Sequence, residues 1–297
     1  MISGFGFGQA MALSAAVSWA LAVMLLRRSG ESLPAFELNL FKNLLGLALL
    51  IPTLIFTLGL DIPDYSAKDL VIALVSGFLG IAVADTWYLR ALNLVGASRT
   101  GIVASLFSPF VILLSVIFLG ESLGGWQLLG FGLVMSGVVL VSWRQSRTEV
   151  DSAQVRKGVL FAAGAVFLMA VGVVMVKEIL ETRPFLWTLS IRMLGGVAGM
   201  MIYVSVRRHW AMVRSQFARP QPWRWIVMGS FLSSYLSMMM WLAGYKYIPA
   251  SEASILNETA SAWIVLFAWL MLGESIGARK LVGLLLTFTG AIVMLQV

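Results

Sequence analysis

Long apolar stretches constrain the fold of this chain more than any other feature. Stretches of about 20 residues, each long enough to cross a bilayer as a helix, follow one another from end to end. Only 12% of the 297 residues are charged, whereas a soluble protein carries about 25%. We therefore predict an all-α integral membrane protein with ten transmembrane helices, at 6–27, 34–58, 68–91, 97–119, 124–143, 157–179, 184–206, 223–246, 250–272 and 278–296.

The two halves of the chain resemble each other at offsets of 150 and 153 residues. The matching positions are Pro34 and Pro184, Lys42 and Arg192, Ala97-Ser98 and Ala250-Ser251, and Leu-Gly-Glu-Ser at 119–122 and 272–275. This predicts two five-helix repeats, 1–147 and 148–297. With an odd number of spans in each, the second repeat enters the membrane from the opposite face, which is an inverted plan common among secondary transporters.

The repeated motif also matches G-x-S-x-G, the nucleophile pattern of α/β-hydrolases. That site needs a strand, a sharp turn and a histidine, but both copies lie between apolar spans and the single histidine, His209, lies in a distant basic loop. We expect instead that Gly120 and Gly273 end a helix, and that the Glu-Ser after each caps the next one. The sequence predicts no enzyme, no catalytic residue, no cofactor and no metal site.

Two longer segments carry a resemblance to a known family. The segments ALNLVGASRTGIVASLFSPF (91–110) and LAGYKYIPASEASILNETASAW (242–263), together with the two LGES motifs, resemble the ten-helix EamA-type branch of the drug/metabolite transporter superfamily. The resemblance covers nearly the whole chain and implies transport of some metabolite. The family often has an acidic residue before proline in these helices. Here Ser108-Pro109 and Glu258 depart from that pattern, so no family role is carried onto Glu258.

The distribution of basic residues predicts the orientation in the membrane. Loops after odd-numbered spans hold fifteen Lys and Arg residues, and loops after even-numbered spans hold four. By the positive-inside rule the odd loops are cytoplasmic and both termini are extracytoplasmic. The family resemblance implies the reverse, and we follow the charge count. The expected location is the inner or plasma membrane, as a multi-pass protein.

Charges inside a span are costly unless they face protein or water, so they mark candidate sites. Lys42 and Arg192 each lie eight residues after a proline, roughly 12 Å into their helices at 1.5 Å per residue. Because the repeats are inverted, both cations are expected near the bilayer midplane, where such transporters bind substrate. Glu258 is at a similar depth, whereas Asp85 and Glu37 lie nearer the ends of their spans.

Two interpretations of these charges stay open. In one, Lys42 and Arg192 hold a substrate carboxylate or phosphate and Glu258 holds an ammonium group or a proton. In the other, Glu258 or Asp85 pairs with a cation as an internal brace. The predicted substrate-binding residues are Lys42, Arg192, Glu258, Asn39, Asn43, Trp19, Tyr88 and Trp241, and the three aromatic residues can also serve as helix packing or interfacial anchors.

The function predicted from these features is secondary transport by alternating access. The expected partners are the lipid bilayer and a small amphipathic metabolite, with an amino-acid-like compound first and an anionic metabolite such as an organic acid or sugar phosphate second. Protons are the candidate coupling ion, nucleic acid is not expected, and the chain is expected to be a monomer or homodimer. A membrane-embedded enzyme or sensor is the alternative of another class. Efflux and uptake both stay open.

Overall fold

The computed structural model describes residues 6–29, 33–59, 63–142, 152–272 and 277–295, and within these ranges the secondary structure is helical, with no strand. The described helices of the first half are α1 (Phe7–Ser29), α2 (Ala35–Leu58), α3 (Ala67–Gly77), the π-helical segment η1 (Phe78–Ala84), α4 (Asp85–Ala104), α5 (Phe107–Leu119) and α6 (Gly125–Ser142).

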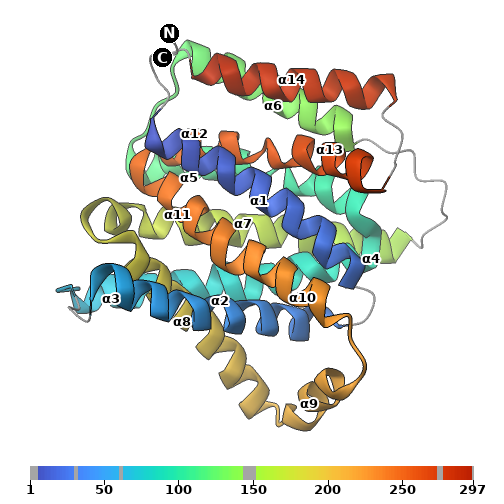
Figure 1. The fold of residues 1–297 in the computed structure, drawn as a ribbon. Coiled ribbons are helices and arrows are strands. Elements are labelled where there is room, and N and C mark those ends of the chain that lie inside the picture. Colours follow the sequence, from blue (N-terminus) through green and yellow to red (C-terminus); the bar gives the residue numbers. More distant parts are fainter. Residues whose placement is uncertain (1–5, 30–32, 60–62, 143–151, 273–276, 296–297) are drawn as a thin grey trace.

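The second half repeats this order with two more helices, because α9 is added on the surface and the counterpart of α4 is divided into α11 and α12. Its helices are α7 (Ser152–Thr182), α8 (Phe185–Val206), α9 (Trp210–Ala218), α10 (Trp223–Ser230), the π-helical segment η2 (Phe231–Ser237), α11 (Met238–Tyr247), α12 (Ala250–Asn257), α13 (Ala260–Leu272) and α14 (Ala278–Met294). The short helix α9 lies at the lower edge of the bundle in Figure 1 and packs against α2 and α8 through Val213 and Phe217.

Seven helical runs among the described residues are long and apolar enough to cross a bilayer, which confirms a multi-pass helical membrane protein. They are Phe7–Leu26, Ala35–Leu58, Ala67–Val95, Ala153–Thr182, Phe185–Val206, Trp223–Tyr247 and Ala250–Met271. Two shorter apolar helices lie at Phe107–Leu119 and Gly125–Leu140. The count of ten spans stays a prediction. Large apolar side chains such as Phe56, which is 89% exposed, lie on the outside, as lipid contact requires.

The predicted boundary between the third and fourth spans is wrong. The sequence analysis ends one span at 91 and starts the next at 97, but α4 continues through both positions to Ala104. In the second half the corresponding boundary is real, since α11 ends at Tyr247 and α12 begins at Ala250. The difference follows from one residue. Pro249 cannot continue a helix, whereas position 96, which lies 153 residues earlier, is a glycine and keeps its backbone N–H.

Irregular helix geometry recurs in both halves at an offset of 153 residues. The π-helical segments η1 and η2 start at Phe78 and Phe231, and they have equal length. The fourth and ninth predicted spans are each broken by a two-residue turn, at 105–106 and at 258–259. Such segments widen or interrupt the hydrogen-bond ladder and are frequent at functional sites. Both kinds of irregularity therefore fall at matching depths of the two halves.

Helices α6 and α14 pack against each other along one edge of the molecule, at the top of Figure 1. A Cβ placed on Gly130 would come within 2.7 Å of the Gly290 carbonyl oxygen, and one on Gly137 within 2.6 Å of the Gly283 carbonyl oxygen. Small residues thus let the two backbones approach closely, as in many membrane helix pairs.

The main hydrophobic core lies among α2, α7, α8, α11 and α12. Glycines again set its tightest contacts, since a Cβ on Gly46 of α2 would come within 2.6 Å of the Ser234 carbonyl oxygen in η2. The candidate residues on α2, α8 and α11 are therefore held on a rigid, closely packed frame.

Candidate functional site

Lys42 is braced by an acidic side chain of the same half. It projects from α2 and is 4% exposed, and its Nζ atom forms an ion pair with Oδ2 of Asp85, the first residue of α4. Two buried opposite charges in contact offset much of each other's desolvation cost. The brace that the sequence analysis kept open is therefore present for this cation, with Asp85 as the partner.

Asn39 and Asn43 join α2 to η1 and the start of α4. Asn39 donates from Nδ2 to the Ile81 carbonyl oxygen at 2.8 Å and to Thr86 Oγ1 at 3.1 Å. Asn43 donates to the carbonyl and side-chain oxygens of Asn39 at 2.9 and 2.8 Å, but its own Oδ1 is buried without a hydrogen-bond partner. The pair thus has a clear structural role, with one acceptor left over.

Arg192 differs from Lys42 in having no acidic partner among the described residues. It lies on α8, is 2% exposed, and its buried Nη1 atom forms no hydrogen bond. Its guanidinium carbon lies 5.7 Å from the centre of the Trp241 ring, which is cation–π geometry. A buried arginine with a free donor is costly unless something anionic or polar supplies the missing contact.

The contrast between the two cations has a simple origin in the repeat. The residue 153 positions after Asp85 is Met238, the first residue of α11. Where the first half supplies a carboxylate for Lys42, the second half therefore has a thioether. Methionine cannot neutralise a guanidinium, so Arg192 has no carboxylate in contact among the described residues, and Asp85 acts on it only from a distance.

Tyr245 belongs to this site although the sequence analysis does not select it. It is fully buried on α11, its hydroxyl has no hydrogen-bond partner, and its ring packs edge-on against Trp241 at 4.9 Å between centroids. Arg192 and Glu258 both act electrostatically on its hydroxyl. The only sequence signal is its position four residues after Trp241, which places both rings on one helix face.

Glu258 lies at the break between α12 and α13 and is 9% exposed. Its Oε1 atom accepts a hydrogen bond of 3.3 Å from the backbone N–H of Ser108, near the start of α5. Carboxylates are favoured at this position because the first amides of a helix lack internal partners. The Oε1 atom thus caps the start of α5, and the Oε2 atom forms no hydrogen bond with another of the described residues.

The two remaining aromatic candidates lie differently. Tyr88 is half-buried on α4, and the carboxyl groups of Glu258 and Asp85 both act electrostatically on its hydroxyl. Trp19 is half-buried on α1, and none of the contacts that join the other candidates in the described structure includes it. The structure therefore places Trp241 beside both Arg192 and Tyr245, sets Glu258 within electrostatic range of Tyr245 and Tyr88, and leaves Trp19 outside.

A cavity of about 570 Å³ opens at one end of the bundle, which we call the basic face. It is bordered by the start of α2, the middle of α4, the start of α7, the end of α8 and α9. Among its lining residues are Glu37, Arg90, Lys157 and His209. Arg207 and Arg208 follow α8 at this end, so the cavity lies beside several described basic residues.

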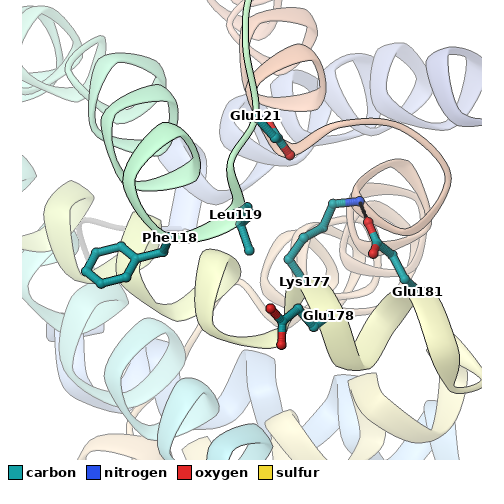
Figure 2. Close-up of a pocket in the computed structure, with 6 residues that line it drawn as sticks. All are labelled: Phe118, Leu119, Glu121, Lys177, Glu178 and Glu181. Carbon is teal, nitrogen blue, oxygen red and sulfur yellow. Dashed lines mark ion pairs between the residues drawn. The ribbon is translucent and has the colours of Figure 1, made fainter.

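The other end, which we call the opposite face, is held together by polar contacts. Glu121 accepts hydrogen bonds from the backbone N–H groups of Ala250 and Ser251 at 2.6 and 2.9 Å, and from Ser251 Oγ at 2.7 Å. Lys177 on α7 donates to the Ile248 carbonyl oxygen at 3.0 Å. Figure 2 shows Glu121 and Lys177 reaching toward the same region from different elements.

These contacts correct one prediction and confirm another. Gly120 does end α5 in a left-handed conformation, with φ of 67°. Glu121, however, does not cap the helix that follows it, since α6 begins only at Gly125 and the carboxylate caps α12 of the other half. The direction of the side chain is set by a partner distant in sequence. Gly273 and its Glu-Ser lie outside the described residues.

Comparison with known proteins gives the same class of protein. The chain is 25% identical over 231 residues to "Uncharacterized transporter sll1164" of Synechocystis sp. (strain ATCC 27184 / PCC 6803 / Kazusa), covering 76% of this chain but 65% of that protein. It is 20% identical over 267 residues to "Uncharacterized transporter YetK" of Bacillus subtilis (strain 168), covering 89% of this chain and 79% of that one.

A solved structure titled "Crystal structure of protein" has a similar fold, with a TM-score of 0.78 and 18% sequence identity, covering 96% of this chain and 95% of that one. The sequence model of the EamA-like transporter family matches twice, at residues 6–143 and 156–296. Because these matches span nearly the whole chain, this protein belongs to the EamA-like transporter family and is a membrane transporter rather than an enzyme.

Proposed function

We propose that the protein is a secondary transporter of small amphipathic metabolites, with amino-acid-like compounds as the substrate class. In this proposal residues 1–147 and 148–297 are inverted five-helix repeats, and transport proceeds by alternating access between them. The site comprises Arg192, Trp241, Tyr245 and Glu258, near the middle of the bundle. Lys42 takes part indirectly, because its ion pair with Asp85 fixes α2 against α4.

The buried, unpaired guanidinium of Arg192 is the observation that carries the proposal. Arginine presents planar donors that match a carboxylate, and its free Nη1 atom is the group left to bind one. A substrate carboxylate would supply the charge that Met238 does not. The neighbouring Tyr245 hydroxyl is a second free donor, and the Trp241 ring offers an apolar surface beside both.

Glu258 supports an amino-acid-like substrate over a purely anionic one. Its carboxyl group lies at a helix break with one oxygen engaged by Ser108, which leaves the other available for an ammonium group. An anion alone would gain nothing from this acid. The second candidate, an organic acid or sugar phosphate, is favoured by Arg192 if Glu258 serves only to cap α5.

Alternating access is supported by the unequal ends of the molecule. The basic face has a cavity of about 570 Å³, whereas the opposite face is joined by Glu121, Lys177 and their backbone partners. Tyr65 adds to this closure through a 2.9 Å hydrogen bond with Thr188, and burial raises the pKa of its phenol, which keeps it a neutral partner. The arrangement is that of a conformer accessible from the basic face.

The decisive experiment is thermal unfolding of the purified protein with a panel of amino acids, matched carboxylic acids lacking the amine, and sugar phosphates. A true ligand stabilises the folded state, by about 2.7 kcal/mol at a hundred times its Kd. Arg192→Met should abolish this stabilisation, while Arg214→Met, an exposed change on α9, should preserve it. Equal stabilisation of wild type and Arg192→Met by a compound that is also transported into proteoliposomes would refute the site.

The same panel separates the two substrate classes. Stabilisation by amino acids but not by their deaminated analogues supports the amino-acid-like class, and Glu258→Gln should then remove that preference. Stabilisation by the carboxylic acids or phosphates alone, unaffected by Glu258→Gln, would establish the anionic class instead.

A further inference from the structure

We propose that Glu121 is the gating residue of the opposite face, and that it holds this face closed by capping the start of α12. The inference rests on the alternating access proposed above. It adds a specific carboxylate, outside the substrate site, whose bonds must break each time the opposite face opens.

The bonds of Glu121 link the two halves at one point. Its two carboxylate oxygens together accept from two backbone amides and one hydroxyl, all at residues 250 and 251, with distances between 2.6 and 2.9 Å. Hydrogen bonds to an ionised acceptor are roughly twice as strong as neutral ones. The start of a helix also favours negative charge. This is therefore the strongest polar contact between the loop after α5 and the second half.

The turn between α11 and α12 is held from its other side as well. Lys177 donates to the carbonyl oxygen of Ile248 while it pairs with Glu181 at 2.7 Å, so α7 fixes one end of the turn and Glu121 fixes the other. In Figure 2 the Lys177 ammonium group lies beside Glu181 and Glu121 extends from the loop above them. Opening this face requires the turn to move away from both.

Helices α5 and α12 are joined at both ends by carboxylates. Glu121, just after α5, binds the start of α12, and Glu258, at the end of α12, binds the start of α5. Between them the hydroxyls of Ser108 and Ser254 lie 3.1 Å apart. Helices α5 and α12 therefore behave as one unit that extends from the proposed substrate site to the opposite face. A movement of Glu258 would be transmitted to the contact of Glu121 through α12, which is a single short helix.

The release of Glu121 is compatible with rapid transport because water can take its place. A cavity of about 210 Å³, lined by Glu121, Lys177, Glu178 and Glu181, borders the contact. Such a polar cavity has room for water that replaces the lost hydrogen bonds. The hydrogen bonds of Glu121 thus stabilise the closed face, and water that replaces them lowers the free energy needed to open it.

Cysteine labelling tests the inference directly, because the chain has no cysteine of its own. Ser254→Cys places a thiol behind the gate, at a fully buried position one turn beyond Ser251. Tyr203→Cys places one at an exposed position lining the cavity of the basic face. Each is labelled with a water-soluble maleimide in detergent, without substrate, in combination with Glu121→Ala or the matched control Glu178→Ala.

Glu121→Ala should raise the labelling rate of Ser254→Cys by roughly tenfold, since at least one charged hydrogen bond is lost. It should lower the labelling of Tyr203→Cys, whereas Glu178→Ala, an exposed change in the cavity beside Glu121, should alter neither. If Glu121→Ala prevents folding, Ser251→Ala removes only the hydroxyl bond and should raise Ser254→Cys labelling by a smaller factor.

Unchanged labelling of Ser254→Cys, or an equal rise at both positions, would overturn the gate, because the second result indicates general loosening. A rise at Ser254→Cys with no change at Tyr203→Cys would support the gate but contradict strict alternating access. Since no substrate is present, failure of the Arg192 site would leave all of these results unaffected.

Discussion

At the level of residues, the two intramembrane cations have different chemical situations. Lys42 is neutralised within its own half by Asp85, and Arg192 has Met238 at the matching place. An inverted repeat in which both cations were braced would be stable but would offer a substrate no free charge. The absence of a carboxylate at position 238 is therefore what supports the proposal that Arg192 binds an anionic group.

The Lys42–Asp85 pair should behave as a brace in mutagenesis. Lys42→Met leaves Asp85 buried without its partner, and Asp85→Asn does the same to Lys42, so each should destabilise the fold by about 3–5 kcal/mol. The double variant should recover most of this loss, because no charge is then left unpaired. Thermal unfolding of the two single variants and the double variant measures the coupling. Additive losses would show that the ion pair contributes nothing.

Glu258 is the candidate proton site. Glu258→Gln keeps an acceptor for the Ser108 amide and removes the ability to change charge, so α5 should stay capped. We expect the variant to lose uptake driven by a pH gradient while retaining exchange of labelled substrate across the membrane. Flux into proteoliposomes, with and without an imposed gradient, measures both. Retained gradient-driven uptake would leave Glu258 with only its structural role.

The sequence could show which charges are buried, but not what they contact. The spacing of Lys42 and Arg192 from Pro34 and Pro184 predicts their depth, and that prediction needs only helix geometry. Their partners depend on rotamers and neighbouring helices, which is why Asp85 could be kept only as one alternative. Tyr245 could not be predicted, because tyrosine is common in apolar spans. What distinguishes it is a buried hydroxyl without a hydrogen-bond partner, and only the structure shows that.

At the level of elements, two glycines on α6 provide a matched test of helix packing. Gly130→Ala would drive a Cβ into Met294 and the Gly290 carbonyl oxygen, whereas Gly132→Ala meets nothing within 4 Å. The first should cost about 1–3 kcal/mol through overpacking. The second should be neutral or slightly stabilising, because alanine favours the helix. Unfolding midpoints compare the two, and equal effects would argue against a close contact between α6 and α14.

The elements were predictable where a single residue type decides them. Pro34 and Pro184 immediately precede α2 and α8, as expected. The π-helical segments were not predictable, since "FLGIAVA" and "FLSSYLS" share an initial Phe-Leu but carry no breaker that marks a wider turn. Glu121 was assigned to the wrong helix for a related reason. A capping side chain can bind the start of any helix within its reach. Only the folded chain shows that the carboxylate of Glu121 lies at the start of α12 and not at the start of α6.

At the level of the whole molecule, the orientation prediction can be tested with a reporter fused after Val297. If the positive-inside rule holds, a phosphatase there should be active outside the cytoplasm and a fluorescent protein should stay dark. Lys177 and Lys246 on the opposite face donate to backbone carbonyls at Ile248 and at Leu180 and Arg183, which leaves fewer free cations there. The reverse reporter pattern would refute the orientation.

The overall class was predictable because the bilayer allows so few solutions. Long apolar runs with few charges such as 35–58 and 185–206 can hardly be anything but spanning helices. The internal repeat is a prediction from a handful of matches in the sequence, and the family model matches two segments, 6–143 and 156–296. Such matches do not reveal where the two halves differ, and the proposed site depends on one such difference, Asp85 in the first half and Met238 in the second.

The two π-helical segments make the chain sensitive to a particular kind of mutation. A substitution that returned 78–84 to α-helical hydrogen bonding without shortening it would turn every side chain beyond it by about 100° around the helix axis. Asp85 would then face away from Lys42. The same change within 231–237 would turn Trp241 and Tyr245 away from Arg192. Composition, hydropathy and span length would scarcely change, so a variant of this kind would insert into the membrane normally. It would nevertheless have lost the arrangement of side chains that forms the proposed site.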